Sequence, residues 1–116
     1  MPPREWQLRV EDILDAIAKI DRYVEGLTFE QFQSDEKTLD AVVRNLEVIG
    51  EAVRHLAAAT DELPESIPWA DIAGMRNILI HEYFSVDVRI IWHTISSDLP
   101  TLRLGLQQLL GKTRFG

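Results

Sequence analysis

The chain has 116 residues, of which 46% are hydrophobic and 27% charged, and its formal net charge is −7 at pH 7. This length and composition suit one domain over residues 1–116 with a packed core, and the absence of cysteine excludes disulfides and thiolate zinc sites. The acidic balance argues against a general nucleic-acid coat protein, so a phosphate-bearing ligand would be bound by a local site and not by the whole surface.

The sequence predicts an all-α domain whose first helix spans residues 5–25. Gly26 is a plausible stop for this helix. Thr28, followed three residues later by Gln31, resembles a capping box for a short second helix. The apolar residues of the first helix recur at spacings of three and four, as expected for one buried face: Ile13, Ile17, Ile20 and Val24.

A third helix is predicted from about Asp35 to Ala59, with Ser34 as its N-cap. Gly50 lies inside this helix and costs about 1 kcal/mol relative to alanine, so we expect another helix to approach it closely. The helix carries an apolar stripe formed by Leu39, Val42, Val43, Leu46, Ile49, Val53 and Leu56.

Residues 61–68 contain two prolines and are predicted to form a loop. Pro68 suits the start of a fourth helix, which should end at about His81. Ser85 is a good N-cap for a fifth helix, in which Asp87 in the first turn would favour the helix dipole.

The fifth helix should be kinked or divided in two by Pro100, because proline lacks the N–H that an α-helix needs. Gly111 is predicted to end it, leaving residues 112–116 as a frayed tail. The fourth and fifth helices are apolar on more than one face, which is difficult to bury in a domain of this size. We therefore expect a homodimer that buries part of both helices.

The segment 74–83 contains the motif R-x4-H-x-Y, formed by Arg76, His81 and Tyr83. The apolar residues 78–80 favour burial, so the motif should lie beside a core or an interface. At about 100° per residue, Arg76 and His81 lie about 140° apart on an ideal helix. The two side chains therefore meet only if the helix unwinds near His81 or if a second subunit supplies the same residues across a two-fold axis, and we favour the second subunit.

These residue types suit phosphodiester chemistry without a metal ion. Histidine can take a proton from a ribose 2′-hydroxyl or give one to a leaving oxygen, and a guanidinium grips a phosphate with paired hydrogen bonds. Asn77 could orient His81 or donate to a phosphate oxygen, and Tyr83 could bond the phosphate, stack on a base or be modified. Spacing alone does not select this interpretation, because most helical Arg/His pairs form ion pairs or cap a helix.

Other residues allow further interpretations. Trp69 and Trp92 are expected in the core. The sequence contains no metal-ligand cluster and no Gly-rich phosphate loop, so we expect neither a metal nor a cofactor.

Four charged residues of the third helix stand three and four apart: Arg44, Glu47, Glu51 and Arg54. They form either a ladder of surface ion pairs or a support in which one of the two glutamates orients the motif.

No run approaches the roughly 20 apolar residues of a membrane span, and residues 1–9 lack the apolar region of a secretory signal. We therefore expect a cytoplasmic protein that does not bind membranes.

The chain as a whole resembles the HepT-like branch of the HEPN superfamily. The R-x4-H-x-Y motif is intact, with a polar residue directly after the arginine. The resemblance extends in order over AVVRNLEVIGEA (41–52), IPWADIAGMRN (67–77), HEYFSVD (81–87) and DLP (98–100). It implies an all-α, HEPN-type helical bundle that forms a homodimer, in which two motifs face a shared cleft.

The resemblance also implies a function. Proteins of this family are toxins of type VII toxin–antitoxin modules, act as metal-independent endoribonucleases on RNA, and have an MntA-like minimal nucleotidyltransferase as antitoxin partner. By this resemblance Arg76 and His81 are the catalytic pair, and Asn77 is the supporting polar residue. Tyr83 is the tyrosine that the antitoxin modifies with AMP. The alternative is a non-catalytic helical dimer that binds a nucleotide or a partner, which an acidic surface fits better than tight RNA binding.

Overall fold

The computed structural model describes residues 3–59, 63–65, 67–82 and 85–115. The backbone stays helical at both ends of a central π-helix, so the last three elements form one continuous helical segment. Within the described ranges the fold is all-α, as predicted, with five helices if that segment is counted once. The elements are α1 (Pro3–Val24), α2 (Phe29–Ser34), α3 (Glu36–Ala59), α4 (Trp69–Glu82), α5 (Val88–His93), the π-helix η2 (Thr94–Asp98) and α6 (Leu99–Phe115).

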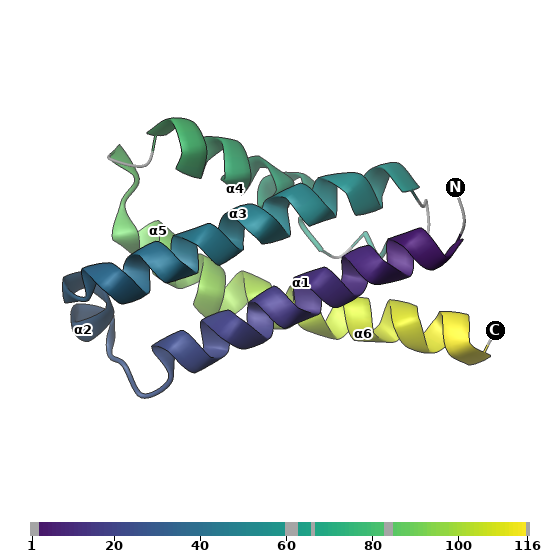
Figure 1. Cartoon of the computed structure of the whole chain (residues 1–116), viewed down its shortest axis with the longest axis horizontal. Coiled ribbons are helices and arrows are strands. Elements are labelled where there is room, and N and C mark those ends of the chain that lie inside the picture. Colours follow the sequence, from purple (N-terminus) through teal and green to yellow (C-terminus); the bar gives the residue numbers. More distant parts are fainter. Residues whose placement is uncertain (1–2, 60–62, 66, 83–84, 116) are drawn as a thin grey trace.

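Helix α3 lies in the middle of the bundle (Figure 1). It packs along α1 on one side and against α4 on the other, and both neighbours run antiparallel to it. Helix α6 contacts α1, while the short α2 contacts α3 and α5 at one end of the bundle. Three long helices, α1, α3 and α4, therefore share one side of the molecule.

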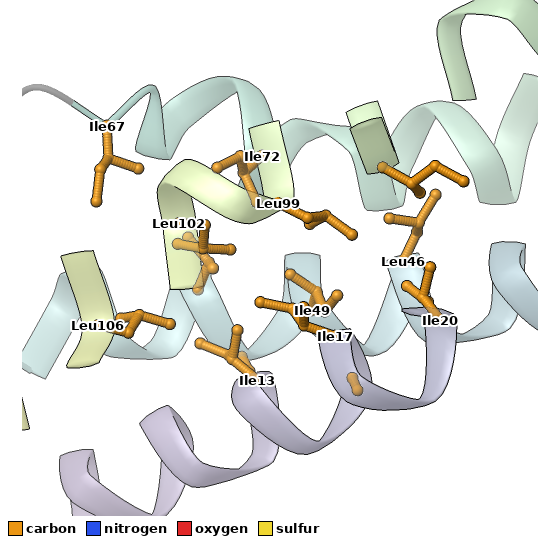
Figure 2. Close-up of a cluster of buried hydrophobic side chains, with 14 of the residues drawn as sticks. Ile13, Ile17, Ile20, Leu46, Ile49, Ile67, Ile72, Leu99, Leu102 and Leu106 are labelled. Atoms are coloured by element: carbon orange, nitrogen blue, oxygen red, sulfur yellow. The ribbon is translucent and has the colours of Figure 1, made fainter. Parts of the chain in front are cut away.

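The core consists of the apolar stripes that the sequence predicted. Figure 2 shows side chains from α1, α3, α4 and α6 meeting in one cluster. Burying one such leucine or isoleucine contributes roughly 1.5–3 kcal/mol relative to leaving it exposed. The side chains with 1% exposure or less include Ile13, Ile17, Ile20, Ile49, Leu99, Leu102 and Leu106. An ion pair of 2.7 Å between Asp21 and Arg103 joins α1 to α6 at the edge of this cluster.

Both predicted core tryptophans lie against the core, half-buried. The indole Nε1 of Trp69 donates a 2.6 Å hydrogen bond to the carbonyl oxygen of Pro64, which ties the preceding loop to α4. Trp92 packs against Phe29 and Phe32 of α2, with ring centroids 5.9 and 5.0 Å apart. Of the predicted loop over 61–68, the described residues are non-helical, and residues 61, 62 and 66 lie outside the described ranges.

The predicted end of α1 and start of α2 are confirmed. Gly26 has a φ of 77°, the left-handed conformation that glycine adopts without strain, two residues after α1 ends at Val24. The capping box is complete: the Thr28 N–H donates to Gln31 Oε1 at 3.0 Å, and the Gln31 N–H donates to Thr28 Oγ1 at 3.2 Å.

The predicted N-cap of α3 is wrong by one residue. Ser34 is the last residue of α2, and Asp35 caps α3 instead. One carboxylate oxygen of Asp35 accepts the Thr38 N–H at 3.1 Å, and the other accepts the Thr38 hydroxyl at 2.7 Å. These hydrogen bonds favour the ionised form and hold the pKa of Asp35 below its ordinary value.

The predicted N-cap of α5 is also displaced. Asp87, and not Ser85, caps this helix, because its carboxylate accepts the Arg89 N–H at 2.9 Å. The same carboxylate pairs with the Arg89 guanidinium at 2.7 Å, and these contacts lower the pKa of Asp87. The Ser85 hydroxyl instead donates to the carbonyl oxygen of Glu82 at 3.0 Å, on the last turn of α4.

Pro100 lies in the first turn of α6 and does not divide the final helical segment in two as predicted, because a π-helix precedes it and the backbone stays helical. The Leu99 N–H donates to the carbonyl of Thr94, five residues back, so the chain widens by one residue just before the proline that lacks an N–H. The predicted stop at Gly111 and the frayed tail over 112–115 are wrong, because α6 continues to Phe115, and residue 116 of the predicted tail lies outside the described residues. Helical hydrogen bonding there outweighs the modest helix penalty of a single glycine.

Candidate functional site

Gly50 sets the distance between α3 and α4. A Cβ atom at Gly50 would lie 2.9 Å from the Cβ of Arg76, 3.2 Å from the carbonyl oxygen of Ile72 and 3.3 Å from that of Ala73. A residue with a side chain does not fit at such distances, so α3 and α4 can cross this closely only because residue 50 is a glycine. The predicted close approach of another helix is confirmed, and the residue it brings against α3 is Arg76.

Next to Gly50, Glu51 reaches the motif. Its Oε2 lies 3.0 Å from Nε of Arg76, with the two side chains 32% and 38% exposed. Oε2 itself is fully buried and accepts no hydrogen bond of good geometry among the described residues, so this is a close charge contact and not an aligned hydrogen bond. A buried carboxylate oxygen therefore depends on Arg76 for its electrostatic partner.

The other carboxylate oxygen of Glu51 is held by its own helix. Oε1 accepts from Nη2 of Arg54 at 2.8 Å and contacts Nε2 of His55 at 3.0 Å. The hydrogen bond from Arg54 is the largest cause that lowers the pKa of Glu51, followed by the contact with His55 and the charges of Arg54 and Arg76. Glu51 thus makes ion pairs along α3 and also contacts Arg76, whereas Glu47 makes no ion pair with Arg76 in the described part.

Asn77 contacts Arg76 only weakly, and His81 makes no hydrogen bond or ion pair with Arg76 or Glu51 among the described residues. Nη1 of Arg76 donates to Oδ1 of Asn77 at 3.5 Å, a long hydrogen bond at the surface. His81 is exposed on the last turn of α4, which is helical without interruption as far as Glu82. The helix therefore does not unwind between Arg76 and His81, and one chain does not bring the two side chains together. Tyr83 lies outside the described residues.

An open groove of about 660 Å³ is lined by residues of α1, α3 and α4. Arg76 is part of its wall, while Asn77 and His81, both described residues, are outside its lining. Its lining includes Lys19 and Tyr23 of α1, Arg44, Val48 and Glu51 of α3, and Arg76 and Ile80 of α4.

Sequence reasoning did not find the contribution of α1 to this groove. A signal was present, because an outward face of α1 carries polar and aromatic residues at helical spacings of three and four. Its members Arg9, Asp12, Lys19 and Tyr23 all line the groove. Such a face is ordinarily a solvated helix surface, and only the packing of α1 on α3 turns it toward Arg76.

The apolar residues around the motif are only partly buried. Leu79 is buried as predicted, whereas Ile78 and Ile80 are 44% and 43% exposed. In the described part of the chain, no three or more histidine or acidic side chains gather where they could hold a metal ion. No described helix combines the length and apolar character needed to cross a membrane.

Comparison with known proteins agrees with the resemblance seen in the sequence. A family model described as Ribonuclease HepT-like matches residues 13–109. A protein of Thermococcus cleftensis, named probable ribonuclease HepT, is 43% identical over 100 residues, which cover 86% of this chain and 91% of that protein. A protein of Caldanaerobacter subterraneus, named provisionally as an RNase, is 43% identical over 105 residues, which cover 90% of this chain and 94% of that protein.

A more distant relative from Methanocaldococcus jannaschii, also named provisionally as an RNase, is 37% identical over 100 residues, which cover 86% of this chain and 83% of that protein. No solved structure matches the chain significantly. Because the family match spans most of the sequence and the relatives match along nearly their whole length, the chain belongs to the ribonuclease HepT-like family.

Proposed function

We propose that this protein is a homodimeric, metal-independent endoribonuclease that acts as the toxin of a type VII toxin–antitoxin module. The observation that carries the proposal is the half-exposed Arg76, held by Glu51 at the wall of a groove, five residues before an exposed His81. Membership in the ribonuclease HepT-like family and the names of the relatives support RNA as the substrate.

In the proposed reaction the ribose 2′-oxygen attacks the adjacent phosphorus, and the bond from phosphorus to the 5′-oxygen breaks. One proton leaves the 2′-hydroxyl and one joins the 5′-oxygen, so the products are a 2′,3′-cyclic phosphate and a 5′-hydroxyl. The imidazole of His81 acts as the base or the acid in these transfers. Arg76 binds the phosphate and stabilises its growing negative charge, and Asn77 supports it by donating to a phosphate oxygen.

A second copy of the chain would complete the site. Ile78 of α4 and Ile90 of α5 are 44% and 54% exposed, so both helices offer apolar surface that a partner could cover. Since α4 directs Arg76 and His81 to different sides, we propose that each site takes its guanidinium from one subunit and its imidazole from the other.

The proposed antitoxin is an MntA-like minimal nucleotidyltransferase that uses ATP. The phenol oxygen of Tyr83 attacks the α-phosphorus of ATP, and pyrophosphate leaves. The attached AMP would place an anion near Arg76 and compete there with RNA. Mass spectrometry after incubation with the partner and ATP should find AMP on Tyr83 and none on a Tyr83→Phe variant. Modification at another residue, or none, would remove this part of the proposal.

Glu51 is proposed as a positioning residue. Its carboxylate touches Nε of Arg76, whereas Nη1 makes only a long hydrogen bond of 3.5 Å to Asn77, so in this proposal a phosphate replaces that weak contact and binds the terminal nitrogens. The contacts from Arg54 and His55 to the other oxygen fix the carboxylate in turn. Glu47 lacks such a contact, so we do not assign it this role.

The test is cleavage of RNA by the purified protein in the presence of EDTA. We expect the wild type to cut RNA, and His81→Ala to lower the rate roughly 10²- to 10⁴-fold, the usual contribution of a proton-transfer group. Arg76→Ala should cause a loss of similar size, while Leu8→Ala, which shortens an exposed side chain outside the groove, should not. Circular dichroism should find all three variants folded. Full activity in either motif variant would refute the assignment.

A second candidate function is a helical dimer that binds a nucleotide or a partner without cutting RNA. The net charge of −7 favours it, because an acidic surface repels nucleic acid. Here the wild type would leave RNA intact in every buffer, and expression of the wild type and of His81→Ala would affect cell growth equally.

A further inference from the structure

The groove between α1, α3 and α4 gathers exposed apolar side chains. Large hydrophobic residues of a folded domain are mostly buried, and those that remain outside are usually scattered. In the described part, three of the exposed ones line this single groove: Tyr23 on α1, Val48 on α3 and Ile80 on α4, with exposures of 39%, 37% and 43%. Three helices therefore each place a partly exposed apolar side chain in the same groove, and one of these side chains is an aromatic ring.

The charge of the groove differs from that of the chain. Four basic side chains and four acidic ones line it, so its formal charge is zero, although the whole chain carries −7. The basic ones include Arg76 and Arg44 on neighbouring helices. The groove is thus a place where the surface does not repel a phosphate group, as an acidic protein with an anionic ligand requires.

We propose that this groove is a nucleotide subsite, in which the base next to the phosphate at Arg76 stacks on Tyr23. The inference rests on the proposed function and adds to it where the RNA strand lies. Val48 and Ile80 provide the apolar floor beside the ring, and Arg44 takes the next phosphate along the strand. Its volume of about 660 Å³ falls within the range of small-molecule sites, enough for one or two nucleotides.

A single-stranded substrate fits this groove better than a second copy of the chain does. The apolar side chains that we assign to the dimer, Ile78 and Ile90, lie outside the groove lining. A stable protein interface buries on the order of 800 Å² on each side, more than a groove of this size offers. Stacking on an aromatic ring is also the usual way in which proteins hold unpaired bases of any sequence.

The experiment uses binding and not cleavage, so that it does not depend on catalysis. A short 2′-O-methyl oligonucleotide lacks the attacking hydroxyl and stays intact during titration with the full-length protein. Loss of one stacked base is worth about 1–3 kcal/mol, so Tyr23→Ala should weaken binding roughly 5- to 150-fold. Tyr23→Phe keeps the ring and should bind within about twofold of the wild type. Leu8→Ala, on the same helix but outside the groove, should not change the affinity.

The role of Arg44 has its own readout. If Arg44 contacts a phosphate, Arg44→Gln should reduce the slope of log affinity against log salt by about 0.7. Arg22→Gln removes the same charge at the exposed end of α1, outside the groove, and should leave the slope unchanged.

Three outcomes would overturn the proposal. The first is wild-type affinity in Tyr23→Ala while Arg76→Ala loses binding, which would leave the proposed nuclease intact but place the base elsewhere. The second is absence of binding by the wild type, whether or not it cuts RNA. The third is dissociation of the dimer in Tyr23→Ala, seen by sedimentation velocity, with affinity per dimer unchanged, since this would assign the groove to a second copy. If the wild type binds the oligonucleotide but does not cut RNA, and Tyr23→Ala weakens the binding, the result would support the subsite and refute the nuclease.

Discussion

The carboxylate of Glu51 contacts side chains of two helices. One carboxylate oxygen contacts Arg54 and His55 of the same helix, α3. The other is buried and lies against Arg76 of α4. Its pKa is lowered, so the group stays ionised as the pH falls below the ordinary value for glutamate. The contact with Arg76 therefore persists at any pH at which histidine chemistry operates.

We predict that Glu51→Gln lowers kcat/KM for RNA cleavage roughly 10- to 100-fold, because a misplacement of about 1 Å at a catalytic group costs that much. The loss should appear mainly in kcat if the charge contact matters most in the transition state. Glu47→Gln removes the same charge from the same groove without breaking a contact with Arg76, and its loss should be clearly smaller. Equal losses in both variants would show that only groove charge matters.

Asp35, the N-cap of α3, allows a test that concerns only the free energy of unfolding. The folded state lowers its pKa, so its cap stabilises the fold fully above the ordinary pKa of aspartate and loses its effect as the pH falls through the lowered value. Urea unfolding should therefore find Asp35→Ala less stable than the wild type at pH 7, with the difference shrinking toward pH 2. Asp35→Asn keeps a capping oxygen and should fall between them. A difference that stays constant with pH would contradict the assigned cap.

At the scale of elements, the crossing of α3 and α4 determines where the motif stands. The crossing is close because Gly50 has no side chain, and the atoms nearest to the missing Cβ belong to Ile72, Ala73 and Arg76. Backbone atoms are among them, so a larger residue cannot be accommodated by turning a flexible side chain.

A matched pair of glycines tests this crossing. Gly50→Ala should destabilise the fold by up to about 2 kcal/mol, because an overpacking cost of about 1–3 kcal/mol outweighs the gain in helix propensity of about 1 kcal/mol. Gly74 lies inside α4, and a Cβ there would meet nothing within 4 Å, so Gly74→Ala should instead stabilise by up to about 1 kcal/mol. Chemical denaturation of both variants decides the matter, and stabilisation by Gly50→Ala would mean that the helices separate without cost.

Most of the helices could be predicted from the sequence, because the buried face of a helix places apolar residues three and four positions apart. This spacing can be recognised without knowing which elements pack against the helix. The stripe with Ile13 and Ile17 and the glycine at 50 are examples. The N-cap was less predictable where two adjacent residues both suit it, as with Ser34 and Asp35. The outcome depends on which side chain accepts an N–H of the first helical turn, here the N–H of Thr38.

In the whole molecule, the packing of the helices determines which motif residues lie together. On one chain Arg76 faces the groove with Glu51, and His81 stands apart on the last turn of α4. The angular separation of the two was predictable from helix geometry, and a contact from a glutamate of α3 to the motif was one of the two interpretations that the sequence allowed. The groove was not predictable, because Tyr23 and Arg76 line the same groove only through the packing of three helices, which no local pattern encodes.

A mixed dimer tests whether the site is shared between subunits. Arg76→Ala and His81→Ala should each be inactive, but subunit exchange between them creates dimers in which one site has both wild-type residues. Random exchange should then restore about a quarter of the wild-type rate. If each subunit used its own Arg76 and His81, every site in the mixture would lack one residue and no activity would return.

The Asp21–Arg103 ion pair joins the first long helix to the last one, 82 residues apart in sequence. The core has the same long-range character, because Leu99, Leu102 and Leu106 of α6 fill the space beside Ile13 and Ile17 of α1 (Figure 2). During synthesis the chain emerges from its N-terminus, so Arg76 and His81 leave the ribosome before the residues that close the bundle. A nascent or prematurely terminated chain that carries the whole motif but lacks residues 99–106 therefore lacks part of the core on which α1 and α3 pack.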